Sequence, residues 1–372
     1  MNIVFMVSTM HTGGAERVAA NLVNNWSKQG HHVTLVATYS GRGECHYVIE
    51  SGVKMVYLSD LVVEGPFIYL RRFIALRRFI IGCKPDIVVS FLPNVNVAAI
   101  LASFGLNIPV VVSERIHPPQ MPIGWFWGLL RRITYPLAKQ VVVQSRETLG
   151  WLRASIPRAE GVIIQNPIDF PLIFSEPEVA VEKYIPPGRK MLLAVGRLDP
   201  QKQFKCLISA FARLADKFPD WVLIILGEGH EHDSLAKLVL SLGLDNRVFF
   251  PGRVGNVGSW YQSADIYVMS SRFEGFPNTL LEAMAYGCPV VSFDCDTGPR
   301  DLIIDEINGL LVKPVGDETA LLGALDRLMG DSGLRVRLGE AATEVQGAFK
   351  LERISEQWLA LFHRLVLVTS KR

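Results

Sequence analysis

Three observations predict an α/β protein made of two doubly wound domains. The 372 residues exceed the ~100 to 200 that are typical of a single domain. Short β-branched runs alternate with longer helical patterns, which is typical of parallel sheets covered by helices on both faces. The alternation stops near residue 166, in an irregular and Pro-rich stretch of about twenty residues, and then starts again.

Each expected strand is a short apolar run. In the first domain, residues 1–170, the strands are expected at 2–8, 31–37, 53–58, 86–91, 108–113, 139–144 and 161–165. In the second domain, residues 186–350, they are expected at 190–196, 221–227, 247–251, 265–270, 289–293 and 309–313. A closing helix within 351–372 is expected to cross back to the first domain. Ligands of such sheets bind outside the carboxyl ends of the strands, so we expect a deep cleft between the domains to hold the site.

The composition excludes several classes of protein. A hydrophobic fraction of 49% with 20% charged residues is far from that of a disordered chain. The five cysteines form no CxxC pair, which favours reduced thiols in the cytoplasm. The first residues are typical of a strand rather than a signal peptide, and arginines interrupt every long apolar run, which argues against a membrane span.

A pair of glycines, Gly13 and Gly14, separates the first strand from a helical pattern. Such a turn lets backbone amides approach a bulky anion at a helix start. The turn is not a GxGxxG sequence, and the second strand ends without the acidic residue that holds an NAD ribose, so a dehydrogenase is not indicated. The alternative is a tight turn without a ligand.

The second domain opens in a similar way. Its first strand runs into Gly196 and Arg197, and Lys202 follows five residues after the arginine. These two cations can meet on one diphosphate, although a solvated loop is the alternative. Arg253 and Val254 also follow a strand and are expected on the same rim.

The segment from residue 272 to 287 carries the strongest pattern. Glu274 precedes a short expected helix and Glu282 lies eight positions later, within it. The amides of the helix start can bind a phosphate, and carboxylates accept hydrogen bonds from sugar hydroxyls. Otherwise the two glutamates are ordinary cap and surface charges. The residues expected at the helix start are Phe276, Pro277, Asn278 and Thr279.

These motifs, together with Asn166-Pro167-Ile168-Asp169, resemble the retaining glycosyltransferases of family 4, which have the GT-B fold. The resemblance spans essentially the whole chain. It implies that Arg197 and Lys202 hold the diphosphate of a nucleotide sugar, Glu282 the ribose and Glu274 the donor sugar. It also implies that Gly13 and Gly14 leave room for the donor phosphates, and that neither a cofactor nor a bound metal is needed. Asp294-Cys295-Asp296 imitates a metal-binding DxD, but we expect no metal there.

One segment departs from the family pattern. Many relatives carry a cleft histidine after the fifth strand, where this chain reads Ser113-Glu114-Arg115-Ile116-His117. Similar Ser-Glu segments occur in bacterial enzymes that build lipid-linked oligosaccharides. Either His117 substitutes for the histidine, or Glu114 and Arg115 grip the acceptor.

The first domain is also the basic one, with 16 Lys and Arg against 10 Asp and Glu in residues 1–170. At ~100° per residue, Arg71, Arg77 and Arg78 of the stretch 67–82 lie within an arc of about 120°. These cations either snorkel from a helix packed on the sheet or meet an anionic membrane surface and a polyprenyl diphosphate. A second stretch, residues 123–132, places aromatic residues beside cations. Nucleic acid is not indicated, because no motif for binding it is present.

The sequence therefore predicts an enzyme, a hexosyltransferase. We expect it to move a hexose or N-acetylhexosamine from a UDP-sugar, rather than a GDP-sugar, to a lipid-linked glycan at the inner face of the plasma membrane. The alternatives are an epimerase or hydrolase of nucleotide sugars and a non-catalytic subunit that binds them.

Overall fold

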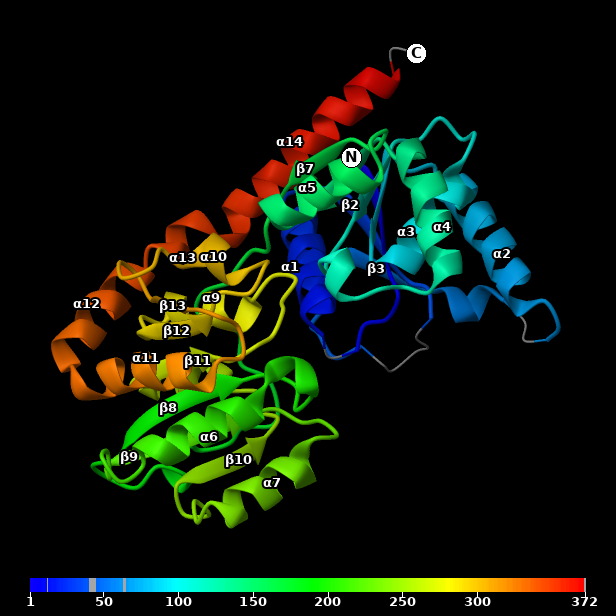
Figure 1. Cartoon of the computed structure of the whole chain (residues 1–372). Coiled ribbons are helices and arrows are strands. Elements are labelled where there is room, and N and C mark those ends of the chain that lie inside the picture. The colour runs from blue at the N-terminus through cyan, green and yellow to red at the C-terminus, as the bar shows by residue number, and fades with distance from the viewer. Residues whose placement is uncertain (12, 40–44, 63–64, 371–372) are drawn as a thin grey trace. The chain divides into compact units, whose positions relative to one another are not determined.

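The computed structural model describes residues 1–11, 13–39, 45–62 and 65–370. It contains two compact units, which are described separately below. Unit 1 consists of residues 1–167 together with 351–372, and unit 2 consists of residues 168–350 (Figure 1).

Unit 1 is built on a sheet whose described strands are all parallel, in the order β3-β2-β1-β4-β5-β6-β7. Most of the strands are runs of β-branched and apolar residues that are buried on both faces, whereas the edge strands β3 and β7 are largely half-buried. The strands are β1 (Asn2–Val7), β2 (His32–Ala37), β3 (Val53–Tyr57), β4 (Ile87–Phe91), β5 (Val110–Ser113), β6 (Gln140–Val143) and β7 (Gly161–Ile163).

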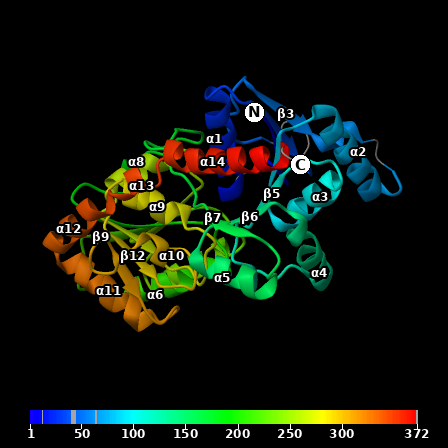
Figure 2. The same ribbon diagram turned by 90° about the horizontal axis from the view of Figure 1, so that it is seen from above.

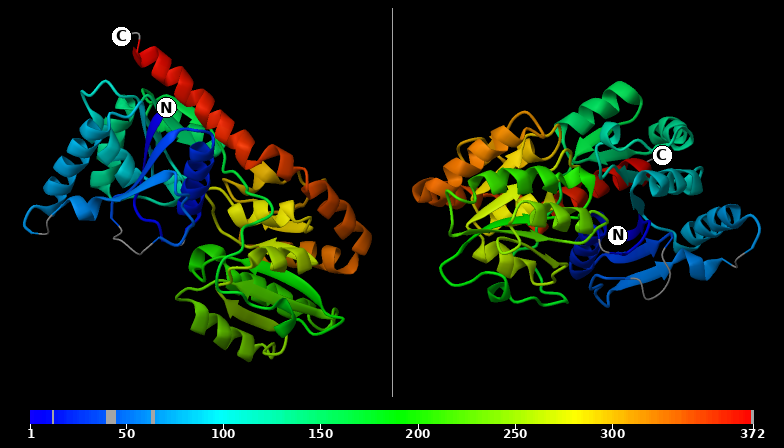
Figure 3. Two further views of the ribbon diagram at one scale, coloured as in Figure 1. Left: turned by 180° about the vertical axis from the view of Figure 1, so that it is seen from behind. Right: turned by 60° about the horizontal axis from the view of Figure 1, so that its bottom comes forward.

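Helices cover both faces of this sheet, as the alternation along β1 requires. Ile3 and Phe5 face one core together with residues of α1 and α14, whereas Val4 and Met6 face a second core with residues of α2, α3 and α5. Figure 3 shows α14 as the long red helix that leads to the C-terminus. The helices are α1 (Gly14–Lys28), α2 (Ile68–Cys83), α3 (Pro93–Ser103), α4 (Trp125–Thr134), α5 (Arg146–Ser155) and α14 (Leu351–Ser370).

Unit 2 repeats this plan with another sheet of parallel described strands, in the order β10-β9-β8-β11-β12-β13. Leu192 and Ala194 of β8 face a core with α6, α7, α11 and α12, and Met191 and Leu193 face another with α8 and α9. The strands are β8 (Lys190–Val195), β9 (Trp221–Leu226), β10 (Val248–Gly252), β11 (Ile266–Met269), β12 (Val290–Phe293) and β13 (Leu310–Val312). The helices are α6 (Phe204–Leu214), α7 (His232–Ser241), α8 (Val257–Ser263), α9 (Asn278–Ala285), α10 (Pro299–Leu302), α11 (Glu318–Gly330), α12 (Ser332–Ala342) and α13 (Val345–Ala348).

The predicted fold class is confirmed, and every predicted strand range overlaps a strand of the described chain, although β10 ends one residue beyond its range. Each sheet also has a point where the strand order reverses direction, between β1 and β4 in unit 1 and between β8 and β11 in unit 2. In doubly wound sheets ligands bind beside the carboxyl ends of the strands at these switch points. The two switch points are therefore where each unit is expected to carry its chemistry.

Candidate functional site

The switch point of unit 2 brings together two segments that the sequence analysis selected. The turn after β8 contains Gly196, Arg197 and Lys202, and the loop after β11 contains Glu274. Gly196 is needed here because the Lys202 side chain lies over it. A Cβ at position 196 would be 2.9 Å from Lys202 Cε, so a larger residue would displace the lysine.

Lys202 and Glu274 form an ion pair at the centre of this site. Lys202 Nζ lies 2.6 Å from Glu274 Oε1, and the two side chains are only 13% and 10% exposed. Three further hydrogen bonds join the same two segments. Ser270 Oγ donates to the Lys202 carbonyl (2.6 Å), Gln201 Nε2 to the Phe273 carbonyl (2.8 Å) and the Arg272 amide to the Gln201 carbonyl (2.7 Å). The turn and the loop are therefore held as one unit.

The other two cations expected on this rim are exposed. Arg197 is 74% exposed, and its Nη2 lies 3.4 Å from Asp199 Oδ2. Arg253, just after β10, is exposed as well, whereas Val254 is half-buried against a core of unit 2. Exposed guanidinium groups remain able to bind an anion that arrives from solvent.

Two glycines after β9 bring backbone against backbone. A Cβ on Gly227 would be 2.0 Å from the Gly196 carbonyl oxygen, and one on Gly229 would be 2.3 Å from that of Leu198. The Leu198 amide also donates to the Glu228 carbonyl (2.9 Å). These glycines therefore fix the turn that carries Arg197 rather than opening space of their own for a ligand.

The four residues predicted at the helix start lie just before or within the first turn of α9. Phe276 and Pro277 are buried, and the Phe276 ring packs against Phe349 with 6.0 Å between centroids. Pro277 caps α9 rather than occupying its first turn, and the Asn278 amide donates to the Phe276 carbonyl. Thr279 Oγ1 accepts a 2.8 Å hydrogen bond from Tyr267 Oη. These contacts hold the start of α9 beside Glu274.

Glu282 is buried in α9 and is oriented by a tyrosine. Tyr261 Oη donates to Glu282 Oε2 at 3.0 Å, and Glu282 is only 3% exposed. Burial raises the pKa of the neighbouring Tyr267, and the carboxylates of Glu274 and Glu282 raise it further, so its hydroxyl stays protonated. A buried carboxylate held this way can accept hydrogen bonds from vicinal hydroxyls.

The segment after β12 braces the Glu274 loop. Thr297 Oγ1 donates to the Glu274 carbonyl, and Gly298, at φ 98°, lies against Pro277 and Glu274. Asp294 of the DxD-like triplet accepts from Arg300 Nε at 2.8 Å and lies 2.8 Å from Lys313 Nζ. No cluster of three or more potential metal ligands occurs among the described residues.

In unit 1, the glycine turn at the switch point is closely packed. The Gly13 amide donates to Tyr47 Oη (2.8 Å), and the same hydroxyl donates to the Gly13 carbonyl (2.7 Å). A Cβ on Gly13 would be 2.2 Å from a carboxylate oxygen of Glu16. Gly14 is exposed in the first turn of α1. The Glu16 carboxylate therefore lies beside the glycine turn of unit 1, whereas the Lys202 side chain lies over the glycine turn of unit 2.

The charged residues after β5 are buried. Glu114 is 2% exposed and accepts from Tyr135 Oη (2.6 Å), with Arg131 Nη1 at 3.5 Å. Burial raises the pKa of Glu114, although Arg131 and Tyr135 oppose this effect. His117 Nδ1 lies 3.0 Å from Thr148 Oγ1.

Arg115, the third charged residue of this segment, is 6% exposed and points to other neighbours. Its Nη2 donates to Asn166 Oδ1, and its guanidinium carbon lies 4.0 Å from the centre of the Phe91 ring. Its Nε has no hydrogen-bond partner among the residues that the structure describes. Burial lowers its pKa to about 9.

The three selected arginines of α2 differ from one another. Arg71 and Arg78 are exposed, whereas Arg77 is half-buried and its Nη1 donates to the carbonyls of Ala102 and Phe104 at 2.9 Å each. Arg77 therefore caps the end of α3, which is an ordinary role for a basic side chain at a helix C-terminus.

Several partners of the site escaped the sequence analysis. Tyr47 and Tyr261 lie far along the chain from the groups they bond and belong to no motif. A signal existed for Tyr267, whose hydroxyl is the polar group of the otherwise apolar strand β11.

Comparison with known proteins identifies the family. The family model for glycosyl transferases group 1 matches residues 176–345, and the model for Glycosyltransferase Family 4 matches residues 12–170. The chain is 30% identical, over 366 residues that cover 97% of it and 98% of the relative, to the GalNAc-alpha-(1->4)-GalNAc-alpha-(1->3)-diNAcBac-PP-undecaprenol alpha-1,4-N-acetyl-D-galactosaminyltransferase of Campylobacter jejuni.

Two further similarities agree with this one. The N-acetylgalactosamine-N,N'-diacetylbacillosaminyl-diphospho-undecaprenol 4-alpha-N-acetylgalactosaminyltransferase of the same species is 28% identical over 376 residues, which cover 95% of this chain and 97% of the relative. The crystal structure of Anabaena HepE in complex with UDP has a TM-score of 0.81 at 19% identity, covering 98% of this chain and all of that one. The chain belongs to glycosyltransferase family 4 and has the GT-B fold, and it is an enzyme of the glycosyltransferase class.

Proposed function

We propose that this family 4 glycosyltransferase moves a hexose or N-acetylhexosamine from a UDP-sugar to a glycan linked to polyprenyl diphosphate, in bacterial glycan assembly. We further propose that transfer retains the anomeric configuration and needs no metal ion. The two Campylobacter relatives are named as N-acetylgalactosaminyltransferases of undecaprenyl diphosphate glycans, which supports this acceptor class. The observation that carries the proposal is the array of Lys202, Glu274 and Glu282 at the β8/β11 switch point of unit 2.

Each group in this array has a distinct task in the proposed reaction. Arg197 and Lys202 hold the diphosphate, whose negative charge grows as the bond to the sugar breaks. Cations already in place stabilise that charge without reorganisation, and positioning lets the acceptor hydroxyl attack on the same face. Glu282 accepts from the ribose hydroxyls and Glu274 from those of the donor sugar.

The transfer itself is tested with the purified chain, candidate UDP- and GDP-sugars and a polyprenyl diphosphate glycan. UDP-N-acetylgalactosamine is the first donor to try, because both relatives are named for that sugar. We expect a product one sugar heavier by mass spectrometry, and loss of most of it in Lys202→Ala and Glu282→Ala. The control is Lys217→Ala, which changes an exposed lysine on the surface of unit 2.

Other outcomes would contradict parts of the proposal. Undiminished transfer by the Lys202 or Glu282 variant would refute the residue assignments. Release of UDP at full rate without an acceptor would favour a hydrolase or epimerase instead. Binding of UDP-sugar without any turnover would favour a non-catalytic nucleotide-sugar-binding subunit.

We also propose that unit 1 binds an anionic membrane surface, as a lipid-linked acceptor requires. The outward face of α4 supports this. Trp125 is 81% exposed, Phe126 52%, Leu129 47% and Ile133 58%, and the spacing of these residues places them on one side of the helix. Such an unpartnered face of large apolar residues suits the interface of a bilayer. No helix of the described chain is both long and apolar enough to span a bilayer.

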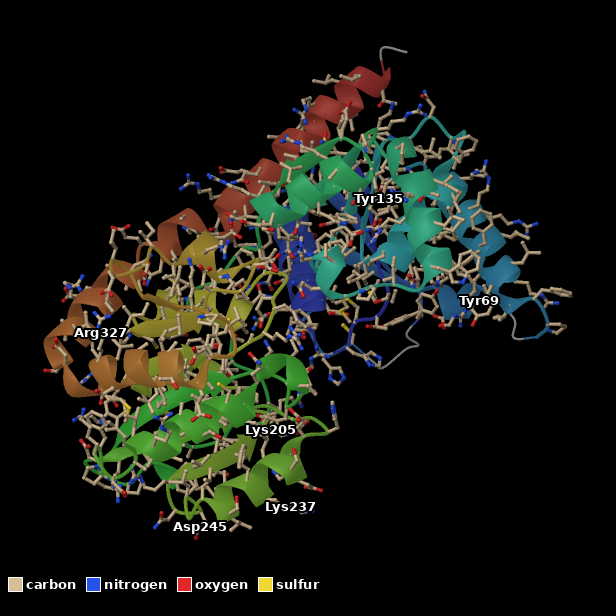
Figure 4. All side chains as sticks on the ribbon, in the orientation of Figure 1. Tyr69, Tyr135, Lys205, Lys237, Asp245 and Arg327 are labelled. Atoms are coloured by element: carbon tan, nitrogen blue, oxygen red, sulfur yellow. The ribbon has the colours of Figure 1, made fainter. Side chains whose placement is uncertain are left out.

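The exposed stripe of α2 supplies the charge that such a surface attracts. Arg71, Ile74, Arg78 and Ile81 are exposed at helical spacing, and Tyr69 points outward from α2 at 75% exposure (Figure 4). Both α2 and α4 pack on α3, which lies between them in Figure 2. Each arginine near an anionic surface contributes about 1 kcal/mol to binding.

Vesicle binding tests this surface. We expect Arg71→Glu with Arg78→Glu, and separately Trp125→Ala with Phe126→Ala, to reduce sedimentation with anionic vesicles and transfer to lipid-linked acceptor. The affinity for UDP should not change. Lys217→Glu with Lys237→Glu, two exposed positions of unit 2, makes the same change in net charge as the arginine double variant and is its control. Unchanged vesicle binding in both double variants would refute the membrane proposal.

A further inference from the structure

The ion pair between Lys202 and Glu274 has a consequence for ligand selection. Under the proposed function these groups bind different parts of one donor, the ammonium its diphosphate and the carboxylate its sugar hydroxyls. In the structure they bind each other at 2.6 Å, with little exposure to solvent. A diphosphate and the Glu274 carboxylate are both anions, so they compete for the same ammonium.

The surroundings of the ion pair make it costly for either group to lose its partner. The pair is largely withdrawn from water, and a buried charge that loses its partner is strongly destabilised. The backbone of Glu274 cannot readily retreat, because Thr297 Oγ1 donates to its carbonyl. The backbone of Lys202 is held in the same way, because Ser270 Oγ donates to its carbonyl.

The nucleotide sugar and the nucleoside diphosphate differ in whether they can give the Glu274 carboxylate a new partner. An intact nucleotide sugar brings hydroxyl donors, which can replace the ammonium on the Glu274 carboxylate while Lys202 turns to the diphosphate. A nucleoside diphosphate brings its negative charge but no sugar hydroxyl. It therefore takes the ammonium and leaves the carboxylate beside it without a donor, and like charges in such proximity weaken binding.

We propose that the Lys202–Glu274 pair makes the site discriminate between the intact nucleotide sugar and the nucleoside diphosphate that remains after transfer. Glu274 is then a specificity-determining residue that weakens product binding, beyond its contact with the donor sugar. This inference rests on the proposed function, since it takes a nucleoside-diphosphate sugar as the substrate.

The test compares the affinities of UDP and UDP-N-acetylgalactosamine by calorimetry for the full chain and for Glu274→Gln. Glutamine keeps the size of the side chain but removes the competing charge. We expect UDP to bind about tenfold more tightly, a change of ~1.4 kcal/mol, because a charged competitor for Lys202 is gone. The affinity for the intact donor should gain less or fall, so the ratio of the two dissociation constants changes in favour of UDP.

Two further variants separate charge from shape. Glu274→Ala removes the charge with a different side chain and should also tighten UDP binding, which covers the case in which the glutamine variant folds poorly. Asp326→Asn is the control. It neutralises the acid of another lysine pair, in which Lys217, after the end of α6, lies 2.6 Å from Asp326 of α11; these side chains are 60% and 35% exposed, and both affinities should stay unchanged.

Each result has one meaning. UDP binding that tightens more than donor binding in the glutamine or alanine variant, with the control unchanged, supports the inference, and equal tightening of both ligands overturns it. Unaltered or weaker UDP binding in both variants overturns it, even though the unaltered chain still binds UDP-sugar. If the unaltered chain binds neither UDP nor any UDP-sugar, the proposed function itself is wrong and the inference falls with it.

Discussion

The switch points of the two units share a topology but differ in chemistry. In unit 2 the turn after β8 and the loop after β11 carry Arg197, Lys202 and Glu274, and Arg197 remains exposed. In unit 1 the turn after β1 is closed by Tyr47 and carries the carboxylate of Glu16. A doubly wound sheet thus provides a place for a ligand, while the side chains decide whether an anion can use it.

Two charged residues that follow β5 of unit 1 are built into the core. Glu114 and Arg115, at the end of β5, are 2% and 6% exposed, and each is bonded within unit 1. We infer that the charges beside the switch point serve ligand binding in unit 2, whereas Glu114 and Arg115 serve the fold in unit 1. Changes of these charged side chains should therefore affect ligand affinity in unit 2 and stability in unit 1.

The largest difference in stability is expected between two glycine substitutions. One changes Gly229, which packs on the turn after β8, and the other changes Gly13, in the turn after β1. A Cβ on Gly229 would lie 2.3 Å from the Leu198 carbonyl oxygen and 2.7 Å from the Leu198 amide nitrogen, and a backbone cannot move aside cheaply. A Cβ on Gly13 would meet only the tip of the Glu16 side chain, which can rotate away. Overpacking costs about 1–3 kcal/mol, so Gly229→Ala should lower the melting temperature by about 5 °C.

Differential scanning fluorimetry of both variants checks this expectation. Gly13→Ala should melt within about 1 °C of the unaltered chain, because a flexible side chain absorbs the new methyl group. Gly229→Ala should also bind UDP more weakly, since it disturbs the turn that carries Arg197. Equal melting temperatures for the two variants would show that the turns are equally tolerant and would remove this contrast.

The sequence was sufficient to predict the fold, and the reason is local. Strands such as Leu192 to Val195 or Val88 to Phe91 are buried on both faces, so they are continuous apolar runs that stand out from the helical segments. The glycine turns and the Glu274 to Glu282 segment were also visible, because their positions follow directly from strand ends and helix signals.

The partners of the site residues could not be predicted in this way. Tyr261 contacts Glu282 from another helix, and Thr297 reaches Glu274 from the segment after β12. Such contacts depend on how neighbouring strands and helices are placed, which periodicity along the chain does not encode. Likewise, helical spacing placed Arg77 on the same side of α2 as Arg71 and Arg78. The structure shows that Arg77 instead donates to the carbonyls of Ala102 and Phe104 at the end of α3.

A smaller effect, on affinity rather than stability, is expected in unit 2 from Tyr261→Phe. The tyrosine hydroxyl donates to Glu282 Oε2 at 3.0 Å, so it holds the carboxylate that we propose binds the ribose. Loss of one hydrogen bond to a charged group is worth about 1.5–3 kcal/mol, and UDP affinity should fall about tenfold. The measurement is calorimetric titration with UDP and with 2′-deoxy-UDP.

The deoxy nucleotide separates a positioning role from a structural one. If Tyr261 orients Glu282 toward the ribose, the variant should lose much of its preference for UDP over 2′-deoxy-UDP. An equal loss for both nucleotides would mean that the tyrosine only supports the fold. Tyr69→Phe, on the exposed face of α2, is the matched control and should change neither titration.

The smallest effect is expected in unit 1, from Glu114→Gln, and it is an effect of pH on stability. Burial raises the pKa of Glu114 in the folded chain above its ordinary value of 4.5. The folded state therefore holds the proton more tightly than the unfolded state does, and the stability from this group is present at low pH and is lost as the pH rises through the raised pKa. Each unit of pKa shift corresponds to ~1.4 kcal/mol.

Melting temperatures of the variant and the unaltered chain between pH 4.5, the ordinary pKa of Glu114, and neutral pH test this expectation. Glutamine does not titrate, so the unaltered chain should lose stability relative to the variant as the pH rises. The affinity for UDP should be the same in both, because Glu114 bonds Tyr135 and Arg131 inside unit 1. A difference in melting temperature that stays constant with pH would contradict a raised pKa, and a loss of UDP affinity would contradict the assignment of this charge to the fold.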